Sequence, residues 1–510
     1  MPGPREGGPD GQSVVRCAVR PAGRAGERPH NPEGRHAAER RRLLPSPRPD
    51  GPCAAGGGLR PGDRIAVQVA KSPEALAVYG AAVALGAVFL PLNTAYTPAE
   101  VDYFLGDATP RIFLCDSAQA PALTPVAERH GARLLTLDAD GTGDLAQRTR
   151  DRPEEIGAEP RDAEDLAALL YTSGTTGRSK GAMLSQRNLL SNAEALADLW
   201  RFTERDVLIH ALPIFHTHGL FVASNVTLLT RGSMIFLPGF DLEAILRWMP
   251  AATALMGVPT FYTRLLSDPR LTRALAAGMR LFVSGSAPLL ADTHAEFEAR
   301  TGHRILERYG MTETNMSTSN PYEGERRAGT VGFPLPGVEL RILDQGREVA
   351  PGEIGVIEVR GPNVFQGYWQ MPEKTAEELR PDGFFVTGDL GCRDAEGYVQ
   401  IVGRQKDLII SGGYNIYPKE VELLLDEQPG VLESAVVGLP LPDLGEAALA
   451  VLVPRPGVTL DPQAVLGAIA DRLARFKQPR AAVLVEELPR NTMGKVQKTL
   501  LRARYAGLFA

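Results

Sequence analysis

The sequence has 510 residues, of which 44% are hydrophobic and 23% charged, with a net charge of −6. This length is too great for one hydrophobic core, so we expect at least two domains. The negative charge argues against nucleic acid as a partner. The longest apolar run, 75–90, is interrupted by glycines and too short for membrane insertion.

The four cysteines are scattered and form no Cys-x-x-Cys pair. This spacing argues against a disulfide framework or a cysteine-bound metal, and it is typical of a cytoplasmic protein. Small molecules are therefore the expected partners, and no oligomeric state is predicted.

Residues 1–58 contain no Ile, Phe, Tyr or Trp and are rich in Arg, Pro and Gly. Such a segment buries too little apolar surface to offset its chain entropy, so we expect a disordered or aberrant N-terminus. An organelle (mitochondrial) transit peptide is the alternative interpretation. Acidic residues argue against that alternative: Glu6, Asp10, Glu27, Glu33 and Glu39.

Regular structure is predicted from Leu59 onward. Residues 64–69 alternate like a strand, and Ser72 followed by Pro73 is a helix start. Strands and helices then alternate to about residue 300, which predicts α/β layers with largely parallel sheets. The expected strands are 87–90, 111–115, 133–136, 206–211, 233–237, 254–257 and 280–284.

Short strands separated by Gly-rich turns follow in 325–402, which predicts a small antiparallel or barrel-like β subdomain. The last hundred residues return to helices, at 420–427 and 462–476, and strands, at 431–439 and 447–453. The fold class is therefore α/β, with a large domain at 59–403, a hinge at 404–407 and a small mobile C-terminal domain at 408–510.

A loop rich in glycine and hydroxyl groups follows the apolar strand near Leu169. It reads Thr-Ser-Gly-Thr-Thr-Gly-Arg-Ser-Lys and ends at Lys180. Glycine lets backbone N–H groups turn toward an anion, and a lysine adds a point charge. The loop is predicted to hold phosphates, with a flexible surface loop as the alternative.

Four further polar clusters stand out. Tyr309-Gly-Met-Thr-Glu313 combines an aromatic face with a carboxylate suited to Mg²⁺, although a helix C-cap after the amphipathic stretch 292–308 is an alternative. Asp389 with Arg404 suits the hydroxyls of a ribose, and Lys495 lies in a basic turn near the C-terminus. His216-Thr-His218 has no third metal ligand nearby in the sequence, so a role in lining a pocket is preferred to zinc binding.

These motifs, in this order, make the chain resemble the adenylate-forming superfamily of acyl-CoA synthetases, luciferases and adenylation domains over residues 59–508. Within it, the runs 213–237, 256–266, 284–290 and 307–321 are most similar to the malonyl-CoA synthetases. The resemblance implies an acid–thiol ligase that uses ATP, Mg²⁺ and coenzyme A. Relatives build a strand and a helix before residue 60, which residues 1–58 are not expected to supply.

The resemblance also implies roles for individual residues. Lys495, Glu313 and Lys180 would be catalytic, and Glu313 would bind Mg²⁺. Lys406 would be the hinge, and Gly412 and Gly413 would line the channel for coenzyme A. The nucleotide would contact Thr172, Ser173, Gly174, Thr175, Thr176, Gly177, Gly285, Ser286, Ala287, Tyr309, Thr312, Asp389 and Arg404.

Substrate choice is expected to depend on Arg308, where many relatives have a small residue. A guanidinium in the acyl pocket would bind a second carboxylate, helped by Ser284 and His216. The alternative is a surface helix residue. The predicted reaction is ligation of malonate to coenzyme A through an acyl-adenylate, with methylmalonate as a second candidate acid. The alternatives are a ligase for another short acid, an adenylation module that loads a carrier protein, and a non-catalytic nucleotide-binding remnant.

Overall fold

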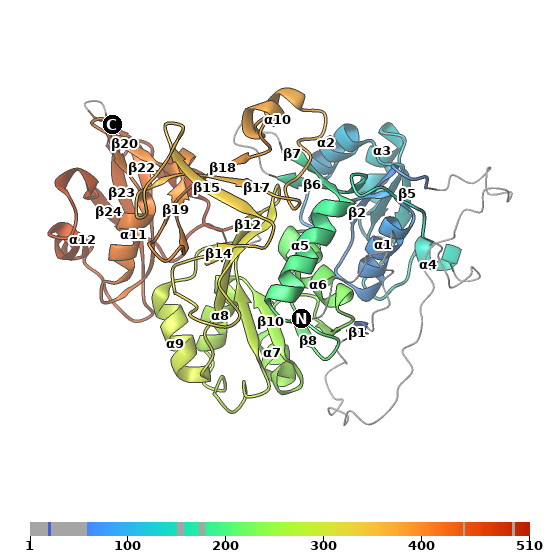
Figure 1. The fold of residues 1–510 in the computed structure, drawn as a ribbon, viewed down its shortest axis with the longest axis horizontal. Coiled ribbons are helices and arrows are strands. Elements are labelled where there is room, and N and C mark those ends of the chain that lie inside the picture. Colours follow the sequence, from blue (N-terminus) through green and yellow to red (C-terminus); the bar gives the residue numbers. More distant parts are fainter. Residues whose placement is uncertain are drawn as a thin grey trace, which may run out of the picture.

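The computed structural model describes residues 19–21, 59–149, 158–172, 179–441, 444–491 and 495–509. Four sheets organise these residues, and Figure 1 shows the first sheet and the last one at opposite ends of the molecule. Among the helices of the described ranges, none is long and apolar enough to cross a membrane.

The first sheet is parallel except at one edge, as the alternating pattern predicts. Its helix α1 (Pro73–Ala84) begins at Ser72, whose side chain accepts from the N–H of Ala75, so the predicted N-cap is confirmed. The helices α2 (Pro98–Ala108), α3 (Ala120–Arg129) and α4 (Asp144–Thr149) follow along the chain. The strand order is β5 (Arg133–Thr136), β4 (Ile112–Cys115), β2 (Arg64–Gln68), β3 (Val88–Pro91), β6 (Leu166–Thr172) and β7 (Lys180–Ser185).

The second sheet is parallel through β12 and then antiparallel. Its order is β1 (Val19–Pro21), β9 (Ser233–Phe236), β8 (Val207–His210), β10 (Ala254–Gly257), β11 (Leu281–Ser284), β12 (Leu306–Met311), β13 (Asn315–Ser319) and β14 (Phe333–Pro334). The edge strand β1 lies in the segment for which no folded element was expected. The helical segments are α5 (Gln186–Leu199), η2 (His218–Ser224), α6 (Asn225–Leu229), α7 (Leu242–Trp248), η3 (Met249–Ala251), α8 (Pro259–Leu266) and α9 (Ala291–Thr301).

One predicted helix is shorter than its sequence pattern. The amphipathic stretch 292–308 is helical only to Thr301, where Gly302 adopts a left-handed conformation with φ of 78°. That conformation suits glycine and ends the helix. Arg308 consequently lies on strand β12, and its interpretation as a surface helix residue is wrong.

The third sheet is the predicted small antiparallel unit. It runs β16 (Arg347–Glu348), β15 (Glu339–Asp344), β17 (Gly355–Arg360), β18 (Phe385–Arg393) and β19 (Val399–Arg404), with α10 (Pro372–Glu378) beside it. The short turn η4 (Gln405–Asp407) then leads to the last sheet.

The C-terminal sheet runs β21 (Tyr414–Ile416), β20 (Ile409–Ser411), β23 (Gly445–Pro454) and β22 (Val431–Leu441), and β24 (Ala481–Leu484) joins β23. The predicted helix 462–476 is regular only as α12 (Pro462–Ala470). The remaining helical segments are α11 (Pro418–Asp426), η5 (Arg475–Lys477) and α13 (Lys498–Tyr505).

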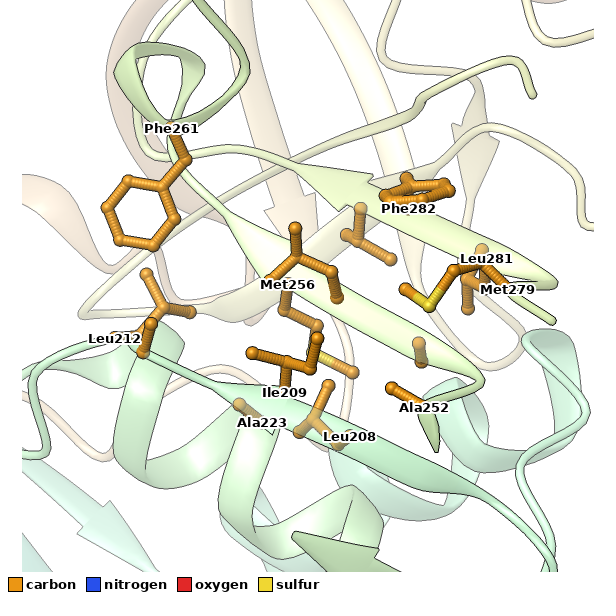
Figure 2. Packing of buried hydrophobic residues seen from close by; sticks show 14 of the residues in the cluster. Leu208, Ile209, Leu212, Ala223, Ala252, Met256, Phe261, Met279, Leu281 and Phe282 are labelled. Atoms are coloured by element: carbon orange, nitrogen blue, oxygen red, sulfur yellow. The ribbon is translucent and has the colours of Figure 1, made fainter. Parts of the chain in front are cut away.

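The core of the second sheet is densely apolar and holds the strands that carry the site. Figure 2 shows side chains of β8, β10 and β11 gathered there, including Ile209, Met256 and Phe282. Phe282 is fully buried, and its ring centroid lies 4.9 Å from that of Phe297 on α9.

Replacing Phe282 by alanine should lower the free energy of unfolding by about 3–5 kcal/mol, because a cavity would remain under α9. Urea unfolding followed by circular dichroism measures the loss. The control is Leu190→Ala at an exposed position of α5, which should change stability by less than about 0.5 kcal/mol. Equal effects of the two substitutions would contradict this account of the core.

Candidate active site

The predicted phosphate loop connects two paired strands. Thr172 at the end of β6 lies opposite Lys180 at the start of β7 in the antiparallel register. The loop residues between them that were assigned to the nucleotide, Ser173, Gly174, Thr175, Thr176 and Gly177, lie outside the described residues. The strand pairing nevertheless places the two ends of the loop, Thr172 and Lys180, side by side.

Lys180 is buried in a polar group at this place. Its Nζ lies 3.3 Å from Glu378 Oε1 and 4.0 Å from the centroid of the Tyr368 ring. The Tyr368 hydroxyl lies 2.6 Å from Glu378 Oε2 and 3.0 Å from Glu313 Oε1. The hydroxyl of Thr172 donates to the same Glu313 oxygen at 3.4 Å. Burial raises the pKa of Glu313.

Two members of this group, Tyr368 and Glu378, were not predicted from the sequence. Glu378 lies 198 positions after the lysine that it contacts. Neither residue belongs to a local pattern of glycines, hydroxyls or paired charges, so only the fold reveals them.

A second group joins two neighbouring strands of the third sheet. Asp389 on β18 lies opposite Arg404 on β19, and their Oδ1 and Nε atoms are 3.1 Å apart. The hydroxyl of Tyr309 donates to the other carboxylate oxygen at 2.6 Å. The structure therefore brings Tyr309, Asp389 and Arg404 together, as the sequence analysis expected. A carboxylate with such partners remains a good acceptor for hydroxyl groups.

The turn after β11 lies against Arg308. A Cβ atom on Gly285 would be only 2.4 Å from Arg308 Cζ, so the guanidinium lies directly over the glycine backbone. Ser286 has a positive φ of 71°, and its hydroxyl lies 3.3 Å from Nδ1 of His218. Ala287 follows in the same turn, and Thr312 is buried beyond Tyr309.

Arg308 is 4% exposed, and among the described residues its Nε and Nη2 atoms have no hydrogen-bond partner. Burial lowers its pKa to about 9, so it stays charged at neutral pH. The hydroxyl of Ser284 also has no partner within the described ranges, and the same holds for Nδ1 of His216 and Nε2 of His218. The electrostatic influence of Arg308 on both histidines shows that these groups lie close together.

His218 is the pocket residue that sequence reasoning assigned least well. It was expected to line a pocket as part of the His-x-His pair but was not named with the substrate residues, yet it is more deeply buried than His216. Burial, followed by the charge of Arg308, lowers its pKa well below the usual value. Both histidines are therefore neutral near pH 7, and each ring can donate one hydrogen bond.

Lys495 extends from the C-terminal part toward this site. Burial lowers its pKa to about 8, with a smaller contribution from the positive charge of Arg404. The charges of Asp389, Glu313 and Arg308 also act on it, so its ammonium lies within electrostatic range of these groups. The lysine predicted to be catalytic thus faces the same site as the other candidate residues.

The hinge residue adjoins the group around Asp389, whereas the channel glycines lie in a separate turn. Burial lowers the pKa of Lys406, which sits in η4 beside Arg404. Gly412 and Gly413 have positive φ angles of 56° and 82° and form the exposed turn between β20 and β21. The N–H of Gly412 donates to the carbonyl of Leu444 at 2.8 Å, so this turn packs within its own domain.

Comparisons with known proteins identify the family of the chain. The family model for AMP-binding enzymes matches residues 55–369, and the model for their C-terminal domain matches residues 420–495. A malonate–CoA ligase of Arabidopsis thaliana is 36% identical over 482 residues, covering 88% of this chain and 79% of its own.

Two crystal structures of MatB from Rhodopseudomonas palustris are 59% identical to the chain and cover 89% of it and 90% of their own chains. The ATP-bound structure superposes with a TM-score of 0.87, and the apo structure with 0.77. The arrangement seen here is therefore nearer to the ATP-bound form. The chain belongs to the family of AMP-binding enzymes.

Proposed function

We propose that this chain activates malonate with ATP and transfers the malonyl group to coenzyme A, giving malonyl-CoA, AMP and pyrophosphate. The observation that carries the proposal is the group of buried nitrogen and oxygen atoms around Arg308 that lack partners among the described residues. An unsatisfied buried polar group costs about 1–3 kcal/mol, and more when it is charged. A second carboxylate of the substrate would satisfy several of them at once. The name of the Arabidopsis relative supports the choice of acid.

The same group discriminates against other acids. Acetate or a fatty acid would leave the Arg308 guanidinium buried without a partner, because neither carries a second anionic group. A planar guanidinium pairs with both oxygens of a carboxylate, which Ser284 and the two histidines would complete. A short dicarboxylate therefore fits better than the other acids considered.

The chemistry takes two steps. One malonate carboxylate attacks the α-phosphorus of ATP, the bond from this phosphorus to the bridging oxygen breaks, and pyrophosphate leaves. The sulfur of coenzyme A then attacks the acyl carbon, its proton is lost, and AMP leaves. Lys495 would neutralise charge that builds between the carboxylate and the α-phosphate, and fixed charges of this kind stabilise transition states.

The nucleotide would lie between the groups described above. Tyr309 and the turn 285–287 would flank the adenine, and Asp389 with Arg404 would bind the ribose. The loop 172–177, Lys180 and Thr312 would hold the phosphates. When ATP binds, Lys180 would have to give up its contact with Glu378 and contact phosphate oxygens instead.

Glu313 fits the expected Mg²⁺ ion. Its carboxylate is buried and has the hydroxyls of Thr172 and Tyr368 beside it, an all-oxygen set of the kind that Mg²⁺ prefers when phosphates complete its shell. When bound, the ion would neutralise charge on the phosphates. The protein's part is to hold Glu313 in place.

The position of Lys495 suggests a domain rotation between the two steps. Residues 408–510 would turn about 404–407 relative to 59–403, withdraw Lys495 and bring Gly412 and Gly413 to the channel for coenzyme A. Lys406 would lie at the pivot. We propose the cytoplasm as the location, and the segment in which a transit peptide would lie is outside the described residues except for 19–21.

Replacing Arg308 by methionine should lower kcat/KM for malonate by roughly tenfold to over a hundredfold, since a hydrogen bond to a charged group is worth about 1.5–3 kcal/mol. In the same variant, kcat/KM for acetate should not fall. The measurement is acid-dependent release of AMP with ATP, Mg²⁺ and coenzyme A, using malonate, succinate and acetate.

Arg304→Met is the matched control, because Arg304 is exposed and paired with Glu298. Its kinetics should equal those of the unchanged protein. A wild-type preference for acetate over malonate would refute the proposed substrate, and thioester formed only on a carrier protein would refute the role of coenzyme A.

Lys495 should give the first half-reaction an alkaline limit. Only the protonated amine neutralises phosphate, and its pKa is lowered to about 8, so kcat/KM for malonate-dependent ATP–pyrophosphate exchange should be constant below pH 8 and fall above it. In Lys495→Arg the fall should move to higher pH, because the new guanidinium stays charged through pH 8 and the pKa of Arg308, about 9, then sets the limit.

Lys495→Ala should reduce exchange by roughly 10²–10³-fold, the loss typical of removing one stabilising charge or donor. Thioester formation from added malonyl-adenylate should change little in the same variant. Equal losses in both half-reactions would contradict the assigned role.

A further inference from the structure

Lys71 connects the first sheet to the second and takes no part in the chemistry proposed above. It follows β2, and its Nζ lies 2.7 Å from the carbonyl oxygen of His210 and 2.9 Å from Nδ1 of the same residue. The Nζ also lies 4.3 Å from the centroid of the Phe236 ring. His210 is the last residue of β8 and is 1% exposed.

The contacts of His210 determine which ring nitrogen carries the hydrogen. Nε2 lies 2.9 Å from the carbonyl oxygen of Gly219, which can only accept. Nε2 must therefore donate, and in a neutral ring Nδ1 is then left to accept from Lys71. Burial lowers the pKa of His210 well below its usual value, which agrees with a neutral ring. The result is a directed chain from Lys71 through His210 to Gly219.

Gly219 lies at the start of η2, one residue after His218. Its carbonyl also accepts from the hydroxyl of Ser224 at 2.9 Å. A Cβ on Gly219 would come within 1.9 Å of the carbonyl oxygen of Pro213, so the loop 213–219 folds tightly back on itself here. Short π-helical turns of this kind occur frequently at functional sites. The chain of hydrogen bonds thus ends on the loop that carries both pocket histidines.

Packing against this loop is incomplete on one side. A pocket of about 110 Å³ lies there, with Lys71, Val69, Pro213, Ile214, Phe215 and Pro238 among its lining residues. Protein interiors are normally close-packed, and a cavity gives neighbouring segments room to shift. Hydrogen bonds with fixed directions are then needed to keep the histidines facing Arg308.

We infer that Lys71 and His210 are positioning residues for the acyl-binding loop, which they hold through the carbonyl of Gly219 so that His216 and His218 face the second carboxylate of the substrate. The inference rests on the proposed function for the identity of that substrate. Neither residue touches the substrate. Their effect should therefore appear mainly in the binding of the acid, because ATP is proposed to be held by other groups, those around Lys180 and around Asp389.

The test compares two substitutions at one position. His210→Gln retains a carbonyl that accepts from Lys71 and an amide that donates to Gly219, whereas His210→Leu retains neither. We expect His210→Leu and Lys71→Met to raise KM for malonate about tenfold, the equivalent of 1.4 kcal/mol, with KM for ATP changed less than twofold. His210→Gln should stay within about threefold of the wild type.

His294→Leu is the matched control. His294 is also buried and donates from Nε2 to a backbone carbonyl, that of Ile305 at 3.0 Å, but it lies on α9 away from the loop. The substitution His294→Leu should lower the melting temperature without changing KM for malonate. The inference is overturned if His294→Leu raises this KM as much as His210→Leu does, if His210→Leu and His210→Gln behave alike, or if KM for ATP rises in parallel.

The wild type measured in the same assay keeps the two claims distinguishable. No turnover of malonate but turnover of another short acid would refute the proposed substrate. The same four variants are then compared on that acid, where an unchanged KM in His210→Leu and Lys71→Met would overturn the positioning role by itself.

Discussion

The site depends on one buried charge. The guanidinium of Arg308 lies over the backbone of Gly285, where any side chain would collide with it, and two of its nitrogens have no partner among the described residues. Burying such a charge is unfavourable unless an anion accompanies it. The carboxylates of the candidate site, Glu313 and Asp389, already have hydroxyl or guanidinium partners of their own. The pocket is therefore built to take its counter-charge from the substrate.

Separate parts of the fold place the reacting groups. Lys180, proposed to bind phosphate, comes from the first sheet, Arg308 and Tyr309 come from the second, and Asp389 and Arg404 come from the third. Lys495 comes from the C-terminal part, and the charges of Asp389 and Glu313 act on it. In the proposed domain rotation, a residue on a movable part serves one step and leaves for the next.

Much of the fold and of the candidate site was predictable from the sequence, because the motifs that indicate them are local. Strand and helix periodicity predicted the parallel sheets, and Ser72-Pro73 predicted the start of α1. The alternative interpretation of Arg308 as a surface helix residue was wrong, because the residues after Gly302 keep a mixed polar and apolar pattern although they form a strand in which Glu307 and Arg308 are buried. Contacts such as Glu378 with Lys180 join positions 198 residues apart, and no local pattern predicts which distant residues will meet.

The most direct test of the account measures binding and not turnover. Malonate and its monomethyl ester share the carboxylate that reacts, but only malonate has the second one. Calorimetric titration of each acid into the protein, with the non-hydrolysable α,β-methylene analogue of ATP present, gives the two dissociation constants. The account predicts that malonate binds at least about tenfold more tightly, since the charged hydrogen bonds to Arg308 are worth about 1.5–3 kcal/mol. Equal dissociation constants would contradict it.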